Sequence, residues 1–120
     1  MHRWIMEISS ASMCLSALAH EGRLSLFRRL VQVGPEGIAA GDLAEAAGAN
    51  FTTVSAQLSV LSHAGLVTSE RHGRSIRYAA NYDGIRAVMA FLMEDCCQGR
   101  PEILTPLAEI ATKAACCGRT

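Results

Sequence analysis

The hydrophobic pattern changes its period twice along this chain, and that change limits the fold more than any other feature. Within 50–64 apolar residues recur at helical spacing, whereas 66–71 and 75–79 read as two strands around a His-Gly turn. From Asp83 the helical period returns. A helix followed at once by a β-hairpin and then by another helix predicts a mainly α fold with a small β-hairpin, the winged helix-turn-helix.

The two helices before the hairpin are predicted to form the helix-turn-helix. The first covers 42–47 and ends at Gly48, because glycine suits the left-handed position that follows a helix C-terminus. The second begins at Asn50, a good N-cap, and buries one apolar face. The residues of that face are Val54, Leu58 and Leu61.

Two amphipathic helices are predicted ahead of this pair. Their apolar residues are Trp4, Ile8, Leu15 and Leu18 in the first, and Leu24, Phe27, Leu30 and Val31 in the second. Because the chain has 120 residues and half of them are hydrophobic, all elements are expected to share one domain, 1–120. Its predicted parts are a helix-turn-helix at 40–64, a wing at 66–80, a dimerisation helix at 83–98 and a helical tail at 105–117.

The long helix after the hairpin carries a continuous apolar stripe, formed by Ile85, Val88, Met89, Leu92, Met93 and Cys96. So long a stripe needs a partner, and a second copy packed about a two-fold axis is expected, with the first helix adding to the seam. The tail is predicted to begin with Thr105 as cap and Pro106 as the first helical residue. Its inward-facing residues are predicted to be Leu107, Ile110, Ala111 and Ala114.

Eleven basic and eleven acidic residues give a net charge of zero, so any basic surface must be local. The predicted hairpin is one such place, since only Glu70 opposes its cations. These cations are Arg71, His72, Arg74 and Arg77. No apolar run approaches the roughly 18 residues needed to cross a bilayer, and the first residues lack the apolar core of a signal peptide. A soluble, cytoplasmic protein without a membrane partner is expected.

Four segments together resemble the ArsR/SmtB family of winged-helix transcriptional repressors. They are 18–24, 42–44, 54–58 and 64–67, and the similarity extends over about 13–97. The resemblance implies a homodimer that binds palindromic double-stranded operator DNA and releases it when a metal or metalloid ion binds. The family usually carries Pro-Thr where this chain has Glu21-Gly22.

Short polar side chains are predicted on the non-core side of the helix at 50–64, where they can reach base edges and phosphates in a major groove. They are Thr52, Thr53, Ser55 and Gln57. The arginine forks of the hairpin suit phosphate oxygens, so the wing is expected to contact the DNA backbone or the minor groove. A solvated polar face, and charges that only prevent aggregation of an exposed hairpin, are the alternatives.

Five cysteines are present, and four of them form the adjacent pairs Cys96-Cys97 and Cys116-Cys117. Clustered thiols in a reducing compartment more often bind a soft metal or sense redox state than form disulfides. Cys14 stands alone in a predicted helix and is expected to be a small buried hydrophobe. His20 and His63 have no partners in the sequence and are expected to be structural or solvated.

The segment 95–99 is similar to an arsenic-responsive subgroup of the family, which carries a vicinal cysteine pair at the end of the dimerisation helix. In that subgroup a third cysteine follows within a few residues, and 100–103 contains none. Cys116 or Cys117, from the same or the other subunit, is therefore proposed to complete a site with Cys96 and Cys97. The implied inducer is trivalent arsenic, as arsenite or methylarsenite, or antimonite, because soft ions prefer thiolates.

Two other signals stay open. Two cysteine pairs also suit a tetrahedral sulfur site for Zn²⁺ or Cd²⁺. A redox or persulfide switch is the second, although a helix C-terminus and the neighbouring Glu94 and Asp95 reduce the thiolate that oxidants attack. An enzyme is not expected, since the sequence holds no paired acid-base constellation, phosphate loop or activated nucleophile.

Overall fold

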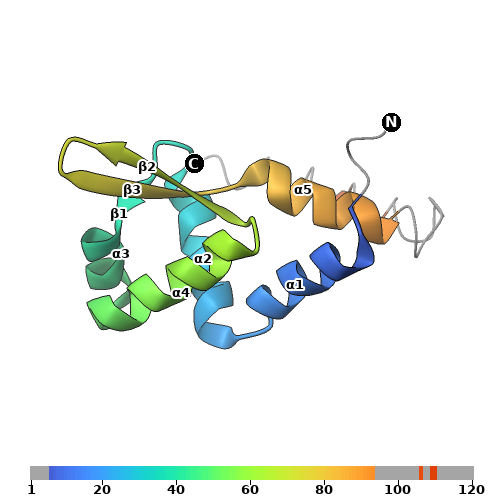
Figure 1. Ribbon diagram of the computed structural model, residues 1–120, viewed down its shortest axis with the longest axis horizontal. Coiled ribbons are helices and arrows are strands. Elements are labelled where there is room, and N and C mark those ends of the chain that lie inside the picture. The colour runs from blue at the N-terminus through green and yellow to red at the C-terminus, as the bar shows by residue number, and fades with distance from the viewer. Residues whose placement is uncertain (1–5, 94–105, 107–108, 111–120) are drawn as a thin grey trace. The chain divides into compact units, whose positions relative to one another are not determined.

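The computed structural model describes residues 6–93, 106 and 109–110. Its helices and strands confirm the predicted mainly α fold with a small β-hairpin (Figure 1). They are α1 (Ile8–Leu18), α2 (Glu21–Val33), β1 (Ile38–Ala39), α3 (Ala40–Ala47), α4 (Phe51–His63), β2 (Val67–His72), β3 (Ser75–Ala80) and α5 (Tyr82–Phe91). The chain divides into two compact units, Met1–Val88 and Met89–Thr120. Within the described residues, no helix has the length and apolar character needed to span a membrane.

Side-chain caps explain where two of the helices begin. Nδ1 of His20 accepts hydrogen bonds from the backbone N–H groups two and three residues later, at 3.1 and 3.4 Å, and so starts α2. Oδ1 of Asn50 accepts from the N–H groups of Thr52 and Thr53, at 2.7 and 3.4 Å, and starts α4. Both caps satisfy N–H groups that have no helical partner. His20 is therefore structural, and Asn50 is the N-cap that the sequence predicts.

Arg23 connects the start of α2 with the end of α1. Its Nε donates to the carbonyl oxygen of Ala17 at 2.6 Å, and its Nη2 donates to that of Ser16 at 3.3 Å. A cationic donor is favourable there because the last carbonyl groups of a helix lack partners and carry partial negative charge. The short connection between the two helices is thus held by one side chain.

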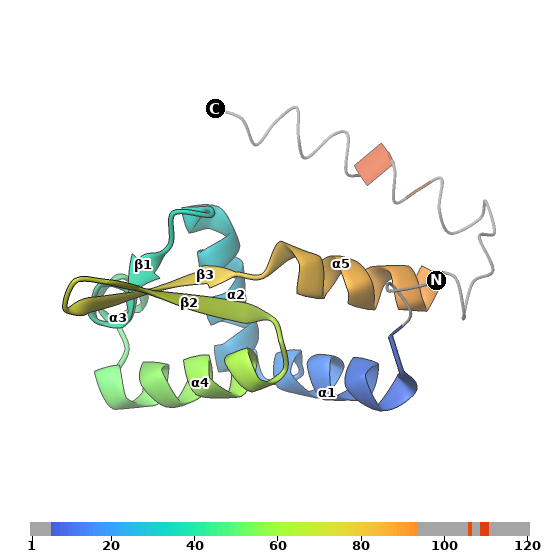
Figure 2. The ribbon, with the colours of Figure 1, turned by 45° about the horizontal axis from the view of Figure 1, so that its top comes forward.

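The three strands form an antiparallel sheet in the order β1-β3-β2 (Figure 2). β2 and β3 form the predicted hairpin, and the pair His72 and Ser75 closes it around a two-residue turn. Gly73 in this turn has a φ of +65°, which glycine adopts without steric cost. β1 pairs Ile38 with Tyr78. The sequence does not predict β1, because a strand of two residues shows no period.

The core of the first unit lies between the helices and the sheet, where β2 packs against α4 and β3 packs against α2 and α3. It contains the predicted apolar face of α4 in full. The largest fully buried side chains are Leu30, Leu43, Val54, Leu58, Leu61, Leu66 and Val88.

The apolar residues that the sequence predicts for the first helix are not the ones that α1 buries within one copy of the chain. The helix buries Ala11, Cys14 and Ala17, whereas Ile8 and Leu15 are 76% and 42% exposed. Small side chains face α2 and α4 because they allow helices to approach closely, and this leaves the larger apolar side chains on the outside. In α2, Phe27 and Leu30 of the predicted apolar residues are buried together with Leu26, whereas Leu24 and Val31 are exposed.

The predicted long helix is described only in part. α5 buries Val88 and exposes Met89, and the remainder of the predicted span, 94–98, lies outside the described residues. In the tail, Pro106, Glu109 and Ile110 are helical. Ile110, which the sequence predicts to face inward, is 63% exposed. The other predicted inward residues, Leu107, Ala111 and Ala114, lie outside the described residues.

Candidate nucleic-acid interface

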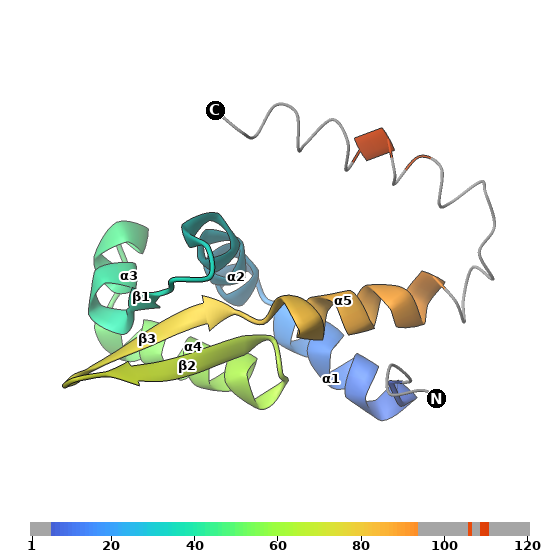
Figure 3. The same cartoon turned by 90° about the horizontal axis from the view of Figure 1, so that it is seen from above.

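The exposed side of α4 carries three of the four predicted base-contacting residues. Thr52, Thr53 and Ser55 are exposed because the apolar face of the helix lies on the opposite side, in the core. All three lie in the N-terminal half of the helix. In the three ribbon views, this end of α4 and the turn of the hairpin lie at the same end of the first unit (Figure 3). A single extended ligand can therefore contact the N-terminal end of α4 and the hairpin turn.

Gln57 is different from these three residues, because it is half-buried against the start of α2. A Cβ atom on Gly22 would lie 2.5 Å from Nε2 of Gln57 and 3.2 Å from Cε1 of His20. The glycine at position 22 thus makes room for the glutamine amide beside the capping histidine. The structure places Gln57 at a helix contact as well as on the rim of the exposed side of α4.

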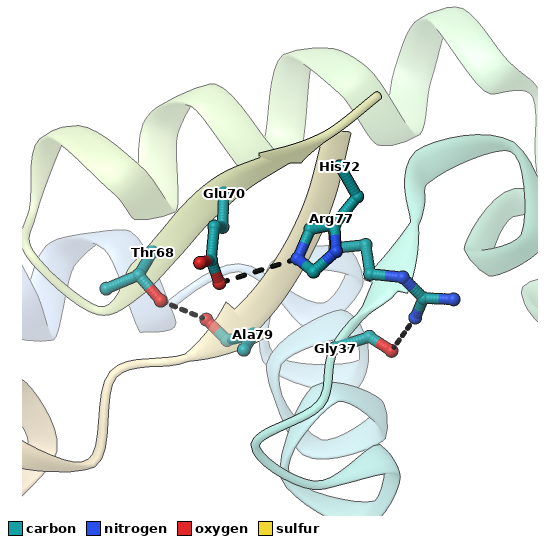
Figure 4. Close-up of polar contacts among 6 residues, drawn as sticks. All are labelled: Gly37, Thr68, Glu70, His72, Arg77 and Ala79. Atoms are coloured by element: carbon teal, nitrogen blue, oxygen red, sulfur yellow. Dashed lines mark hydrogen bonds and ion pairs between the residues drawn. The ribbon is translucent and has the colours of Figure 1, made fainter. Parts of the chain in front are cut away.

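The four predicted hairpin cations have unequal surroundings, and Figure 4 shows those of His72 and Arg77. Nη1 of Arg77 donates to the carbonyl oxygen of Gly37 at 2.8 Å and so ties β3 to the segment before β1. Nε2 of His72 lies 3.5 Å from Oε1 of Glu70. Arg71 and Arg74 are exposed, and neither makes an ion pair with any residue that the structure describes. Arg71 and Arg74 are therefore the hairpin cations for which the described residues provide no hydrogen-bond or ion-pair partner.

Sequence reasoning did not identify Gly37 as a residue that supports this interface. Gly37 has a φ of +77°, and a Cβ atom there would lie 2.9 Å from the carbonyl oxygen of Tyr78. Its backbone must therefore approach β3 closely, which is where the Arg77 bond forms. The Gly34-Pro35-Glu36-Gly37 turn signal was visible in the sequence, but its long-range partner was not.

Cys14 is a buried structural thiol, as expected. It is 3% exposed, and its Sγ donates to the carbonyl oxygen of Ala64 at 3.0 Å, which joins α1 to the end of α4. Burial raises the pKa of this thiol above its ordinary value. The thiolate form, which binds metals and reacts with oxidants, is therefore disfavoured at Cys14.

We expect the cost of replacing Cys14 by alanine to shrink as the pH rises. The folded thiol keeps its proton at a pH where the unfolded thiol has ionised, so its contribution is complete below the ordinary thiol pKa and is lost above it. Urea unfolding of the wild type and Cys14→Ala at about pH 7 and about pH 10 measures this difference. The prediction is contradicted if the difference in unfolding free energy between the two proteins is the same at both pH values. The other four cysteines do not affect this difference, because both proteins contain them.

The predicted metal-binding cysteines, Cys96, Cys97, Cys116 and Cys117, lie outside the described residues. Among the residues that the structure describes, no three His, Cys, Asp or Glu side chains come together as a metal site. His63 makes a contact of 2.9 Å from Nδ1 to the carbonyl oxygen of Ser59 within its own helix. The described part of the chain thus contains the candidate DNA surface without a candidate metal site.

A helix-turn-helix domain family matches residues 18–70. HTH-type transcriptional regulator NmtR from Mycobacterium tuberculosis is 46% identical over 65 residues, which make up 54% of this chain and 52% of that protein. The chain thus spans about half the length of this curated relative. An ArsR-like transcriptional regulator from Rhodococcus sp. RHA1 shares the fold, with a TM-score of 0.68 and 24% identity over 86% of this chain and 93% of that chain.

A second solved structure is more similar in sequence. It is the homodimeric winged helix-turn-helix DNA-binding domain of a possible ArsR-family transcriptional regulator from Mycobacterium bovis. It is 32% identical with a TM-score of 0.61, over 69% of this chain and 75% of that chain. Together with the helix-turn-helix match and the shared fold, this similarity shows that the chain belongs to the ArsR/SmtB family of winged helix-turn-helix transcriptional regulators.

Proposed function

We propose that this protein is a transcriptional repressor that binds operator DNA as a homodimer and leaves it when trivalent arsenic or antimony binds cysteine thiolates. The observation that carries the DNA-binding part is the exposed N-terminal half of α4 at the same end of the unit as the cationic hairpin turn. The remaining parts of the proposal have separate support.

The side chains on α4 suit base reading. Hydroxyl groups such as those of Thr52 and Ser55 donate and accept hydrogen bonds, and the N-terminal residues of a recognition helix are those that meet base edges in a major groove. The cap at Asn50 holds the first turn of this helix in place. Because the net charge of the chain is zero, affinity for the DNA backbone must come from local cations such as Arg71 and Arg74.

A second copy of the chain is the proposed partner of the apolar residues that the first helix leaves uncovered. α1 exposes Ile8 and Leu15, which are seven residues apart and therefore lie on one face of the helix, and α5 separately exposes Met89. Monomeric proteins rarely leave large apolar side chains together on one helix surface. The Mycobacterium bovis domain to which this chain is similar is a homodimer. A two-fold dimer also matches the symmetry of a palindromic operator.

The proposed inducer site consists of Cys96 and Cys97, completed by Cys116 or Cys117. Two adjacent thiols at the end of the predicted dimerisation helix, with another pair near the chain end, suit a soft ion that binds thiolates. The burial of Cys14 leaves the other four cysteines as the candidate ligands. Zn²⁺ or Cd²⁺, and an oxidant or persulfide, are the competing signals.

Fluorescence anisotropy tests the proposal. The fully reduced protein is titrated onto labelled DNA from upstream of its own gene, and the complex then receives arsenite, antimonite, methylarsenite, Zn²⁺ or peroxide in separate experiments. Binding followed by release with trivalent arsenic or antimony only is the expected result. Release by Zn²⁺ or peroxide alone contradicts the inducer and keeps the DNA-binding function, whereas no binding to this or any genomic fragment contradicts the repressor itself.

A further inference from the structure

We infer that a pocket between α1, the start of α2 and the C-terminal end of α4 binds a small carboxylate with an apolar body, such as an aromatic acid. The pocket has a volume of about 300 Å³, at the small end of the range for ligand sites. Figures 1 and 2 show α1 beside this end of α4. None of its lining residues is among the candidate DNA contacts. A ligand there needs neither DNA nor a thiol, so the site is independent of the proposed function.

The apolar part of the pocket comes from one long and one short side chain on each of two helices. Met13 and Ala17 are four residues apart on α1 and share a face of that helix. Val60 and Ala64 are related in the same way at the end of α4. Met13 and Val60 are exposed, whereas Ala17 is buried. The short alanine side chains do not fill the space beside the longer ones, and this space can take the apolar body of a ligand.

Hydrogen bonds hold the walls of the pocket in place. Sγ of Cys14 donates to the carbonyl oxygen of Ala64 and joins α1 to the end of α4. Nδ1 of His63, another lining residue, contacts the carbonyl oxygen of Ser59 within α4. A site that is already arranged loses less conformational freedom when a ligand binds.

Arg23 provides the charge that selects a carboxylate. Two of the five N–H groups of its guanidinium donate to the carbonyl oxygens of Ala17 and Ser16, and the others remain for a ligand. The planar fork of a guanidinium matches the two oxygens of a carboxylate. No lining residue is acidic, and Arg23 makes no ion pair with any described residue. The pocket therefore favours an anion over a neutral or cationic molecule of the same shape.

The test uses benzoate and benzamide, which have the same ring but differ in charge. The reduced full-length protein, labelled with ¹⁵N and free of DNA, is titrated with each compound and followed by ¹H–¹⁵N NMR. For benzoate we expect a dissociation constant of about 1 mM or lower, with the largest shifts at the amides of Ala17 and Ala64. Benzamide should bind at least about fivefold more weakly, because hydrogen bonds to a charged group are stronger.

Two variants with the same chemical change locate the site. Val60→Glu places a carboxylate in the pocket and should weaken benzoate binding at least about tenfold, since like charges in a binding site repel. Val31→Glu is the control, because Val31 does not line the pocket and is 43% exposed, against 41% for Val60. Neither exposed change should unfold the protein. Thermal unfolding checks this.

Three results would overturn the inference. The first is no saturable benzoate binding by the wild type in the millimolar range. The second is equal affinity for benzoate and benzamide, which would mean that Arg23 does not select a carboxylate. The third is wild-type benzoate affinity in folded Val60→Glu, or the same loss in Val31→Glu, which would place the ligand elsewhere. Since DNA is absent from all of these titrations, none of these results bears on the proposed repressor function.

Discussion

Replacing Gly84 by alanine is expected to destabilise the protein by about 1–3 kcal/mol, as overpacking of a tight contact does. A Cβ atom at this position would collide with the carbonyl oxygen of Gly65, which follows α4. That oxygen is held in place because it accepts a hydrogen bond of 2.9 Å from Nδ2 of Asn81. Alanine gains about 1 kcal/mol over glycine inside a helix, but the obstacle is backbone, which cannot rotate away. Urea or thermal unfolding monitored by circular dichroism measures the loss.

Gly41→Ala is the matched control for this substitution. Gly41 also lies in a helix, α3, and a Cβ atom there would meet nothing within 4 Å. Its replacement should stabilise the protein by about 0.5–1 kcal/mol through helix propensity and the unfolded state. Opposite signs for the two variants are the expected result. If Gly84→Ala is as stable as Gly41→Ala, then α5 does not start in close contact with the turn after α4.

The local elements of the fold were predictable from the sequence because local rules determine them. Asn50 is the N-cap of α4, and the apolar stripe of that helix is buried as its spacing indicates. The hairpin follows from the alternation of 66–71 and 75–79 around Gly73. Capping, helical period and strand period each depend on residues within a few positions of one another. A single sequence is therefore enough to predict α4 and the hairpin.

The contacts between distant segments were not predictable in the same way. Ile8 and Leu15 form an apolar stripe, yet α1 packs through Ala11 and Cys14. The sequence alone does not say which of two faces meets the core and which is left for a partner. Arg77 is predicted to contact DNA, and the bond from its guanidinium to the carbonyl oxygen of Gly37, forty residues earlier, is a second role that the hairpin sequence does not indicate. Such roles depend on which segments the tertiary fold brings together, and the period of a hydrophobic pattern carries no information on these long-range contacts.

Cys96→Ser and Cys97→Ser are each expected to abolish release of DNA by arsenite and leave operator binding intact. Both residues belong to the proposed inducer site, and serine cannot provide the thiolate that a soft ion requires. An effector shifts a protein between two states only if it binds one of them more tightly than the other. The resulting coupling typically changes the affinity for the other ligand, in this case DNA, by about 5–150-fold. In both variants arsenite should leave the affinity for DNA unchanged. Anisotropy of the DNA complex during an arsenite titration measures the coupling directly.

Cys14→Ala is the control for this experiment, because Cys14 is buried with its proton donated to Ala64 and is excluded from the proposed site. It should retain release in full. Cys116→Ser and Cys117→Ser then identify the third ligand, since only the one that completes the site should lose release. Wild-type release in Cys96→Ser would contradict the vicinal pair as the sensor. Loss of operator binding by either reduced variant would mean that these thiols support the DNA-binding dimer itself, so that ion capture is not their separate role.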